Sequence, residues 1–394
     1  MKEFISIKNF GPIKDITINE IKPFTVLIGE SGSGKSTLMK VLALFRYINK
    51  MQNIRSYLNR SNVRKSPFEF DMNYYIKNCG FNEFIKNRPE IIYTTTNDDA
   101  TYTHKYSYKN GRLSVDGIIE PEWLEFLKIG FISEKRNIIP QWLDKAQTAN
   151  LGFYFGETSA DFKLGIDLLP EGELPIDFMD LKFQIEKTPV GPKYFIVSTG
   201  KDKYKIPYKD SSSGIQNVVP LLVTMDYFKQ RFDFKKAFER SVLKYLYEGD
   251  RLTEFKAVKE FPELSKKIYL HIEEPELSLY PKTQCLLMDD IVSKCFNQPS
   301  NYAIELMMAT HSPYIINHLN LMIQRYDKQS EKAKYKFENL AAYYIEDGKI
   351  HDLKINKRKL QQFLKNKSQQ AVIRHPCYAN SSAWNKNVYR YLSE

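Results

Sequence analysis

The chain has 394 residues, of which 42% are hydrophobic and 27% charged, and this composition is typical of a globular protein with one large or two smaller cores. No apolar run approaches the roughly 20 residues that span a bilayer, the N-terminus lacks a signal-peptide layout, and the four cysteines form no C-x-x-C pair, so we expect a cytoplasmic protein without disulfides or structural zinc. The formal net charge of +11 indicates an anionic partner such as nucleic acid, although a solvated lysine-rich surface would produce the same excess.

The N-terminal segment follows the order strand, turn, strand, glycine-rich loop, helix. Alternating apolar residues predict strands at 5–7 and 16–18, with a turn over 9–12 between them. An apolar run at 24–28 then leads into GESGSGKST at 29–37, and helically spaced apolar residues follow. This is the GxxxxGK[ST] phosphate-binding loop in its strand–loop–helix context, so the sequence predicts nucleotide binding.

The loop itself supplies the phosphate ligands. Its glycines let backbone N–H groups turn towards phosphate oxygens, and the helix that follows adds the positive end of its dipole. Lys35 would reach the β- and γ-phosphates of ATP, and Ser36 would hold Mg²⁺. The candidate ATP-binding residues of the loop are Gly29, Ser31, Gly32, Ser33, Gly34, Lys35, Ser36 and Thr37.

A long insertion separates this loop from the next catalytic motif. The gap from Lys35 to Glu273 is too long for a compact mononucleotide fold, so we expect inserted β and helical subdomains at about 51–210. The elements expected there are a helix near 81–86, alternating strands over 91–115 with a hairpin turn at Asn110-Gly111, a strand over 128–134, helical residues near 141–169 and strands near 181–208.

The strand at 128–134 ends in a charged segment, Ser133-Glu134-Lys135-Arg136. Its place at a strand end, between the phosphate loop and the motifs that follow, would let it reach the metal or the phosphates. A cluster of surface salt bridges is an equally good interpretation of the same residues.

A second cradle is indicated by SSSGIQ at 211–216, directly before a helical pattern. A Ser-Gly pair at a helix N-terminus can bind phosphate, and here the pair is Ser213 and Gly214. Because one chain does not need two cradles for one nucleotide, we expect this one to close over the γ-phosphate held by another copy of the chain. The alternative is an ordinary helix cap, since serine is a preferred N-cap residue.

Two carboxylates follow the apolar strand expected over 267–272. In a Walker B element one carboxylate serves the Mg²⁺ shell and the next polarises the attacking water, so we assign Glu273 to the metal and Glu274 to the general base. The alternative is a strand followed by an acidic turn. A strand at 303–308 ends near His311, which would sense the γ-phosphate or orient the water, because ligands of open parallel sheets bind at the carboxyl ends of the strands.

Basic residues cluster near 201–209 and in the tail at 354–367, each time with aromatic residues nearby. This mixture suits phosphate contact and base stacking, and Lys357, Arg358 and Lys359 form its densest group. A solvated surface or a docking segment for a protein is the alternative. The other expected elements are helices from 214 to 228, within 235–265, at 282–296 and at 315–323, and a hairpin over 341–355.

Taken as a set, the motifs resemble those of ABC-type ATPases of the overcoming-lysogenization-defect (OLD) class, relatives of RecF and of structural-maintenance-of-chromosomes (SMC) heads. The resemblance covers about residues 1–350. The segments that carry it are IKNFGPI at 7–13, GESGSGKST at 29–37, SSSGIQ at 211–216, IEEPELSLYP at 272–281 and ATHSP at 309–313.

This resemblance implies roles and departures. Ser213 would be the signature serine that acts across a dimer, His311 the switch histidine, and 277–280 the D-loop that links the two sites. Ile215 replaces the second glycine of transporter-type signatures, and Tyr280 stands where many relatives have histidine. No Toprim nuclease pattern follows His311, so the chain looks similar to stand-alone members of Septu-type and retron-associated anti-phage systems.

The sequence therefore predicts an α/β fold, an ABC-type P-loop ATPase head over 1–350 with an antiparallel β insertion and a helical subdomain, and a basic C-terminal extension over 351–394. The expected function is ATP binding and hydrolysis by a homodimer or an assembly of dimers that senses or holds nucleic acid and controls a separately encoded effector, such as a nuclease, in anti-phage defence. The alternatives are a RecF-like DNA repair or recombination ATPase and an ATP-gated nuclease. The expected cofactors are ATP and Mg²⁺.

Overall fold

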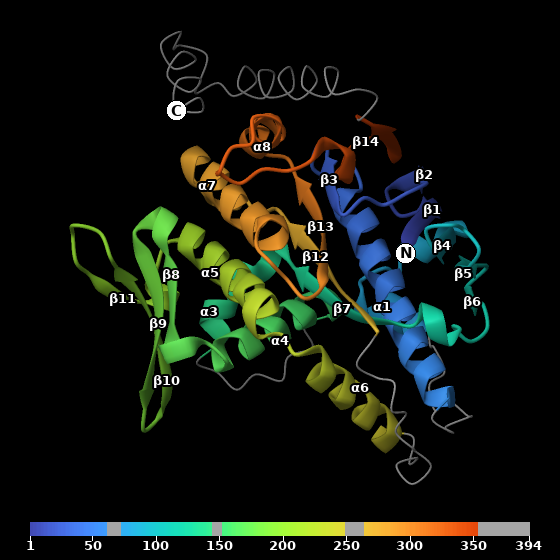
Figure 1. Cartoon of the computed structure of the whole chain (residues 1–394), viewed down its shortest axis with the longest axis horizontal. Coiled ribbons are helices and arrows are strands. Elements are labelled where there is room, and N and C mark those ends of the chain that lie inside the picture. The colour runs from blue at the N-terminus through green and yellow to red at the C-terminus, as the bar shows by residue number, and fades with distance from the viewer. Residues whose placement is uncertain (61–71, 144–151, 249–263, 354–394) are drawn as a thin grey trace.

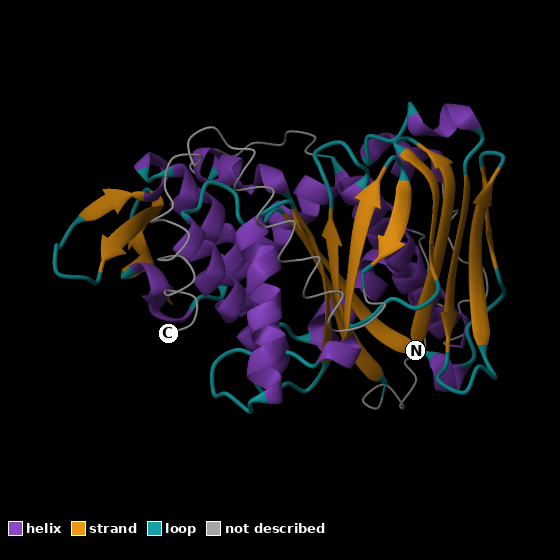
Figure 2. Cartoon of the chain, turned by 90° about the horizontal axis from the view of Figure 1, so that it is seen from above, coloured by secondary structure: helices purple, strands orange, loops and turns teal. Residues whose placement is uncertain are grey.

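The computed structural model describes residues 1–60, 72–143, 152–248 and 264–353. Within them, eleven strands form one mixed sheet in the order β6-β5-β4-β1-β2-β15-β14-β3-β13-β12-β7, and four more form an antiparallel sheet in the order β11-β10-β9-β8. The two sheets lie at opposite ends of the molecule with helices between them (Figures 1 and 2).

The strands differ in burial, which alternates along β4 and β5 but is continuous along β3. They are β1 (Lys2–Phe10), β2 (Ile13–Ile18), β3 (Phe24–Ile28), β4 (Glu90–Thr96), β5 (Thr103–Lys109), β6 (Arg112–Val115), β7 (Glu125–Ile132), β8 (Glu173–Ile176), β9 (Leu181–Thr188), β10 (Gly191–Ser198), β11 (Lys205–Pro207), β12 (Ser265–Glu273), β13 (Ala303–Thr310), β14 (Leu340–Glu346) and β15 (Lys349–Asp352).

Helix α1 is the longest of the described helices, and its 26 residues contain neither glycine nor proline, the two residues that most disfavour a helix interior. The α-helices in the described part of the chain are α1 (Lys35–Arg60), α2 (Met72–Asn78), α3 (Ile139–Trp142), α4 (Phe153–Asp167), α5 (Ser213–Asp226), α6 (Phe234–Glu248), α7 (Pro281–Val292) and α8 (Pro313–Asp327). Among them, none combines the length and the apolar character that crossing a membrane requires.

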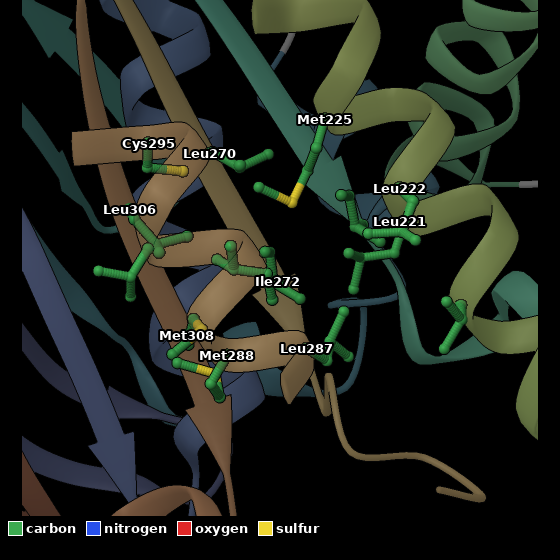
Figure 3. Packing of buried hydrophobic residues seen from close by; sticks show 14 of the residues in the cluster. Leu221, Leu222, Met225, Leu270, Ile272, Leu287, Met288, Cys295, Leu306 and Met308 are labelled. Atoms are coloured by element: carbon green, nitrogen blue, oxygen red, sulfur yellow. The ribbon is translucent and has the colours of Figure 1, made fainter. Parts of the chain in front are cut away.

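The parallel part of the large sheet, β14-β3-β13-β12-β7, has helices on both faces. Successive side chains of a strand point to opposite faces. In β12, Leu270 and Ile272 therefore join the core under α5 and α7, whereas Tyr269 joins the core under α1. Figure 3 shows Met225 of α5 beside Leu270 of β12, and Met288 of α7 beside Met308 of β13. Burial on both faces explains why these strands are nearly continuous in apolar residues.

The expected α/β class with an antiparallel insertion is confirmed. The insertion divides in space, because β4, β5 and β6 extend the large sheet through β1, whereas β8 to β11 form the separate small sheet. The hairpin at Asn110-Gly111 is present, with φ of 52° and 75° at the two turn residues. The subdomain boundaries at about 51–210 and 351–394 stay predictions.

One local expectation needs correction, and another is confirmed. The helix expected near 81–86 is a short 3₁₀ helix at Phe84–Asn87, anchored by Phe84, which stacks on Phe81. The helical stretch expected near 141–169 contains α4, and α3 ends at its start. The basic tail cluster at 354–367 lies outside the described residues.

Candidate functional site

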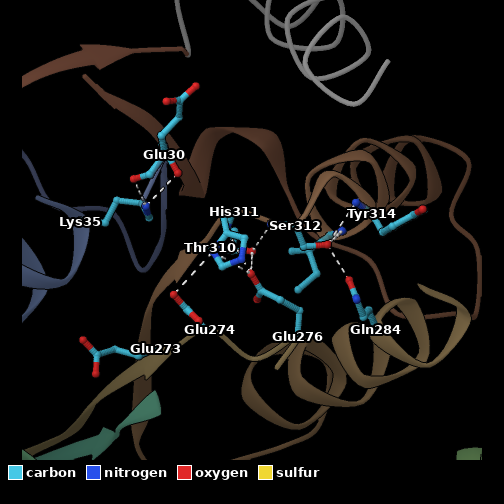
Figure 4. A network of polar contacts seen from close by, with 12 residues as sticks. Glu30, Lys35, Glu273, Glu274, Glu276, Gln284, Thr310, His311, Ser312 and Tyr314 are labelled. Atoms are coloured by element: carbon cyan, nitrogen blue, oxygen red, sulfur yellow. Dashed lines mark hydrogen bonds and ion pairs between the residues drawn. The ribbon is translucent and has the colours of Figure 1, made fainter. Parts of the chain in front are cut away.

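The carboxyl ends of four neighbouring parallel strands carry the predicted motifs. The phosphate loop follows β3, His311 follows β13, Glu273 ends β12, and Ser133 follows β7. Parallel strands place their carboxyl ends at one edge of the sheet, which is where open α/β sheets bind ligands. Figure 4 shows Lys35, Glu273, Glu274 and His311 at this edge.

The phosphate loop turns sharply between β3 and α1. Gly32 and Gly34 have φ of +80° and +107°, a region that side chains with a Cβ rarely adopt. Gly29 is needed for a different reason, because a Cβ there would lie 2.5 Å from the carbonyl oxygen of Ile345 in β14. The backbone of β14 therefore packs directly against the start of the loop.

Lys35 begins α1 and folds its side chain back over the loop. Its Nζ donates hydrogen bonds to the carbonyl oxygens of Gly29 at 2.8 Å and Glu30 at 2.7 Å. Burial lowers the pKa of Lys35, and the carboxylates of Glu274, Glu276 and Glu30 oppose that shift. A cation held only by backbone carbonyls at a helix N-terminus is well suited to meet phosphate oxygens.

Glu273 is fully buried and shares one cation with a second carboxylate. Lys40 of α1 places Nζ 3.0 Å from Glu273 Oε1 and 3.9 Å from Glu134 Oε2. Burial, together with the neighbouring Glu134, raises the pKa of Glu273 to about 8. The pKa of Glu134 falls to about 2, since the hydrogen bond from Glu273 and the charge of Lys40 outweigh its own burial.

Glu274 has a backbone conformation unusual for a residue with a side chain. Its φ is +43°, its N–H donates to the carbonyl of Ala309 at 2.9 Å, and its own carbonyl accepts from Arg136 at 2.6 Å. The side chain is partly exposed and places Oε1 3.5 Å from His311 Nδ1. Such strain persists only where neighbours hold it, and it commonly marks a functional position.

Glu276 is a site residue that the sequence analysis missed. Its Oε1 accepts hydrogen bonds from Thr310 Oγ1 at 2.8 Å and from the His311 N–H at 3.0 Å. The side chain is only 6% exposed, and it fixes the end of β13 against the segment that follows β12. The signal available in the sequence was the third carboxylate of the Glu-Glu-Pro-Glu run.

The segment 133–136 matches neither of its two interpretations in full. Glu134 does reach the neighbourhood of Glu273. Arg136, however, is completely buried and donates to carbonyl oxygens, so it is not part of a surface salt-bridge cluster. The position of Arg136 at a strand end did not predict this burial, because the carbonyl oxygens that it binds belong to distant parts of the chain.

The Ser-Gly cradle at the start of α5 is shaped by a close contact. A Cβ at Gly214 would lie 2.7 Å from the carbonyl oxygen of Ser278, so only glycine lets α5 pack here against the segment after β12. The N-cap residue Ser212 makes no capping hydrogen bond with its side chain. Ser312, the N-cap of α8, does cap its helix through two N–H groups. The start of α5 therefore lacks the side-chain cap that α8 has, and Ser213 is exposed at its first turn.

The donor set at the strand edge fits Mg²⁺, which prefers hydroxyl and carboxylate oxygens. Two carboxylates, those of Glu134 and Glu273, already converge on one positive charge, Lys40 Nζ. Ser36 in the first turn of α1 and Glu273 would hold the ion, which would neutralise phosphate charge. In the described part of the chain, no group of three or more His, Cys, Asp or Glu side chains is arranged to hold a metal.

A glycine-rich loop between a strand and a helix, with carboxylates at the end of another parallel strand of the same sheet, defines a P-loop nucleotide-binding protein. Residues 1–138 and 115–316 match the protein family described as AAA ATPase domain. These matches together span residues 1–316 of the 394, and the chain belongs to this ATP-binding family.

Two solved structures are similar to the chain. One is the SMC head domain from Thermotoga maritima, with 8% sequence identity and a TM-score of 0.37, and the similarity covers 90% of this chain and 99% of that one. The other is the recombination mediator protein RecF with ATP, with 12% identity, a TM-score of 0.37 and coverage of 90% and 99%. Among curated proteins, no significant match to the sequence is found.

Proposed function

We propose that the chain hydrolyses ATP at the strand edge and that two copies complete each site. The observation that carries this proposal is the contact between Glu274 and His311, 3.5 Å apart, at the same sheet edge as the phosphate loop. A carboxylate beside a histidine can polarise a water molecule for attack on the γ-phosphate.

In this proposal the residues of the site have different roles. Lys35 and the first turn of α1 bind the phosphates, and Ser36 and Glu273 would hold Mg²⁺. Glu274 acts as the general base, and His311 contacts the γ-phosphate or the attacking water. Glu276 holds the backbone of His311 in place through the hydrogen bond at 3.0 Å.

Completion by a second copy is supported by the start of α5. Ser213 is exposed, and the N-cap Ser212 leaves the first helical turn without a side-chain cap. These N–H groups and the Ser213 hydroxyl can donate to a phosphate presented by a partner. ATP would then favour the closed dimer because it gains contacts there that the open form lacks. Hydrolysis at Glu274 would remove those contacts.

For the wider role, we propose an ATP-driven switch that holds nucleic acid and controls a separately encoded effector in anti-phage defence. The positive net charge of +11 and the OLD-like set of motifs support this role. A RecF-like repair ATPase without a toxic partner is the second candidate, and an ATP-gated nuclease is the third.

The central experiment is native mass spectrometry of the protein purified together with the products of its neighbouring genes. Bound ATP and a two-copy complex support the proposed switch, and a co-purified nuclease or toxic protein distinguishes defence from repair. A single-copy protein without bound nucleotide, which also shows no ATP turnover in a separate assay, contradicts the proposal. Metal-dependent nucleic-acid cleavage that survives Glu274→Gln would favour the gated nuclease.

Nucleic-acid binding is tested separately by salt titration. If Lys357, Arg358 and Lys359 each meet a phosphate, changing all three to Gln should flatten the log–log salt slope by roughly two to three units. Identical slopes for the variant and the wild type would place the contact elsewhere. No binding by either at low salt would remove nucleic acid from the proposal.

A further inference from the structure

Arg136 is a buried cation whose hydrogen-bond acceptors, among the described residues, are all carbonyl oxygens. The side chain is 0% exposed, and Nη1 donates to the carbonyls of Glu273 at 2.7 Å and Ser133 at 3.1 Å. Nη2 donates to the carbonyl of Glu274 at 2.6 Å, and Nε donates to the carbonyl of Asn217 at 3.0 Å. The guanidinium therefore joins the ends of β7 and β12 to helix α5.

A second hydrogen bond extends this connection to the start of α5. Asn217 is buried, and its Nδ2 donates to the carbonyl of Ser213 at 2.9 Å. An unbroken path thus leads from Ser213 through Asn217 and Arg136 to the backbone of Glu274. At the other end of this path, Arg136 binds the carbonyl oxygen of Glu274, the residue with the strained φ of +43°.

We propose that Arg136 is a positioning residue that couples the Ser213 end of α5 to the general base Glu274 of the same chain. When Ser213 engages the nucleotide of a partner, the shift of α5 reaches Glu274 through these hydrogen bonds. Hydrolysis at one site then depends on occupancy of the other. This inference rests on the proposed function, because it assumes that Ser213 acts on a partner and that Glu274 is the base.

The chemistry of the path requires arginine. A planar guanidinium presents five donors in a rigid fork and can hold carbonyls from three segments at fixed angles. Lysine would keep the charge but lose the fork. Burial lowers the pKa of Arg136 to about 10, and the carboxylates around it oppose that shift, so the side chain remains cationic at neutral pH.

A double-mutant cycle tests the coupling. The variants are Arg136→Lys, Ser213→Ala and the two together, and the measurements are the dissociation constant for ATP and kcat at saturating ATP. We expect Arg136→Lys to leave ATP affinity within about twofold and to lower kcat roughly ten- to hundredfold, because a small misplacement of a catalytic group has effects of that size. The double variant should lose no more activity than the worse single variant.

The matched control is Arg46→Lys, because Arg46 is also a buried guanidinium but binds Glu3 and His271 under α1. We expect this control to lower the thermal midpoint and leave kcat unchanged. If it lowers kcat as Arg136→Lys does, the effect is one of general stability and the coupling is wrong. Asn217→Ala breaks the same path at its other end and replaces Arg136→Lys if that variant does not fold.

The remaining outcomes are also decisive. If the reduction of kcat in the double variant equals the product of the two single reductions, Arg136 and Ser213 act independently. That result overturns the coupling but keeps the proposed function. An Arg136→Lys variant with weakened ATP binding and normal kcat shows a structural role only. If the wild type does not hydrolyse ATP, or Ser213→Ala hydrolyses it normally, the proposed function fails and the coupling with it.

Discussion

His311 Nδ1 lies 3.5 Å from Glu274 Oε1, and this contact joins the carboxyl ends of two adjacent parallel strands, β13 and β12. Backbone contacts hold both residues. The N–H of Glu274 donates to Ala309, and the N–H of His311 donates to Glu276. These hydrogen bonds fix the backbones of both residues at one edge of the sheet, and fixed groups of this kind are what the proposed phosphoryl transfer would require.

The phosphate loop assignment predicts the effect of removing its cation. Lys35→Ala should abolish tight ATP binding, because the phosphates lose the ammonium that now rests on the carbonyls of Gly29 and Glu30. Isothermal titration calorimetry with MgATP measures the affinity. Lys22→Ala is the control, since the Lys22 ammonium pairs with Glu20, outside the phosphate loop. An ATP affinity equal to that of the wild type would contradict the assignment.

The base assignment predicts a separation of binding from chemistry. Glu274→Gln should keep ATP binding and lower kcat by a factor of about 100 to 10,000, the range for loss of a general base. Size-exclusion chromatography with ATP should show that this variant accumulates as the closed dimer. Glu20→Gln, a change at a surface carboxylate, controls for loss of charge. Turnover at the wild-type rate would show that Glu274 is not the base.

If Ser213 acts on the nucleotide of a second copy, mixing two inactive variants should restore part of the ATP hydrolysis. Ser213→Arg should block closure by bulk and misplaced charge but leave nucleotide binding by the single chain intact. Mixed dimers with Lys35→Ala protein can rebuild at most one composite site each. Activity recovered on mixing two inactive variants, followed by phosphate release, supports the shared site. Normal hydrolysis by Ser213→Arg alone would refute the signature role.

A buried histidine predicts how stability depends on pH. His271 is fully buried, and burial together with the adjacent Arg46 lowers its pKa from 6.5 to about 3. The unfolded chain therefore binds a proton between these values that the folded chain does not, and the stability from this residue is lost as pH falls below about 6.5. From pH 7 to pH 5, the free energy of unfolding of the wild type should fall by roughly 2 kcal/mol more than that of His271→Gln.

Urea unfolding at several pH values measures this difference. The comparison of two variants is needed because Asp161, whose pKa burial raises to about 6, titrates in the same range with the opposite sign. Subtraction removes all titrations that the two proteins share. Parallel curves of unfolding free energy for wild type and His271→Gln would contradict the predicted role of His271.

Local spacing within the chain was enough to predict the strand–loop–helix order at 29–37, the carboxylates after β12 and the histidine after β13. Such motifs depend on neighbours a few residues apart, and the parallel strands then bring their ends to one edge. The sequence alone also predicted the hairpin at Asn110-Gly111, since its positive φ angles favour Asn and Gly.

Only the tertiary structure decided which charged residues are buried and what they bind. Arg136 contacts a carbonyl 81 residues away in α5 and another 137 residues away in β12, and no local pattern records such partners. The same holds for Lys40 with Glu273 and for Glu276 with His311. Burial depends on how β7, β12 and α5 pack together, and that packing is a property of the whole fold rather than of any one segment.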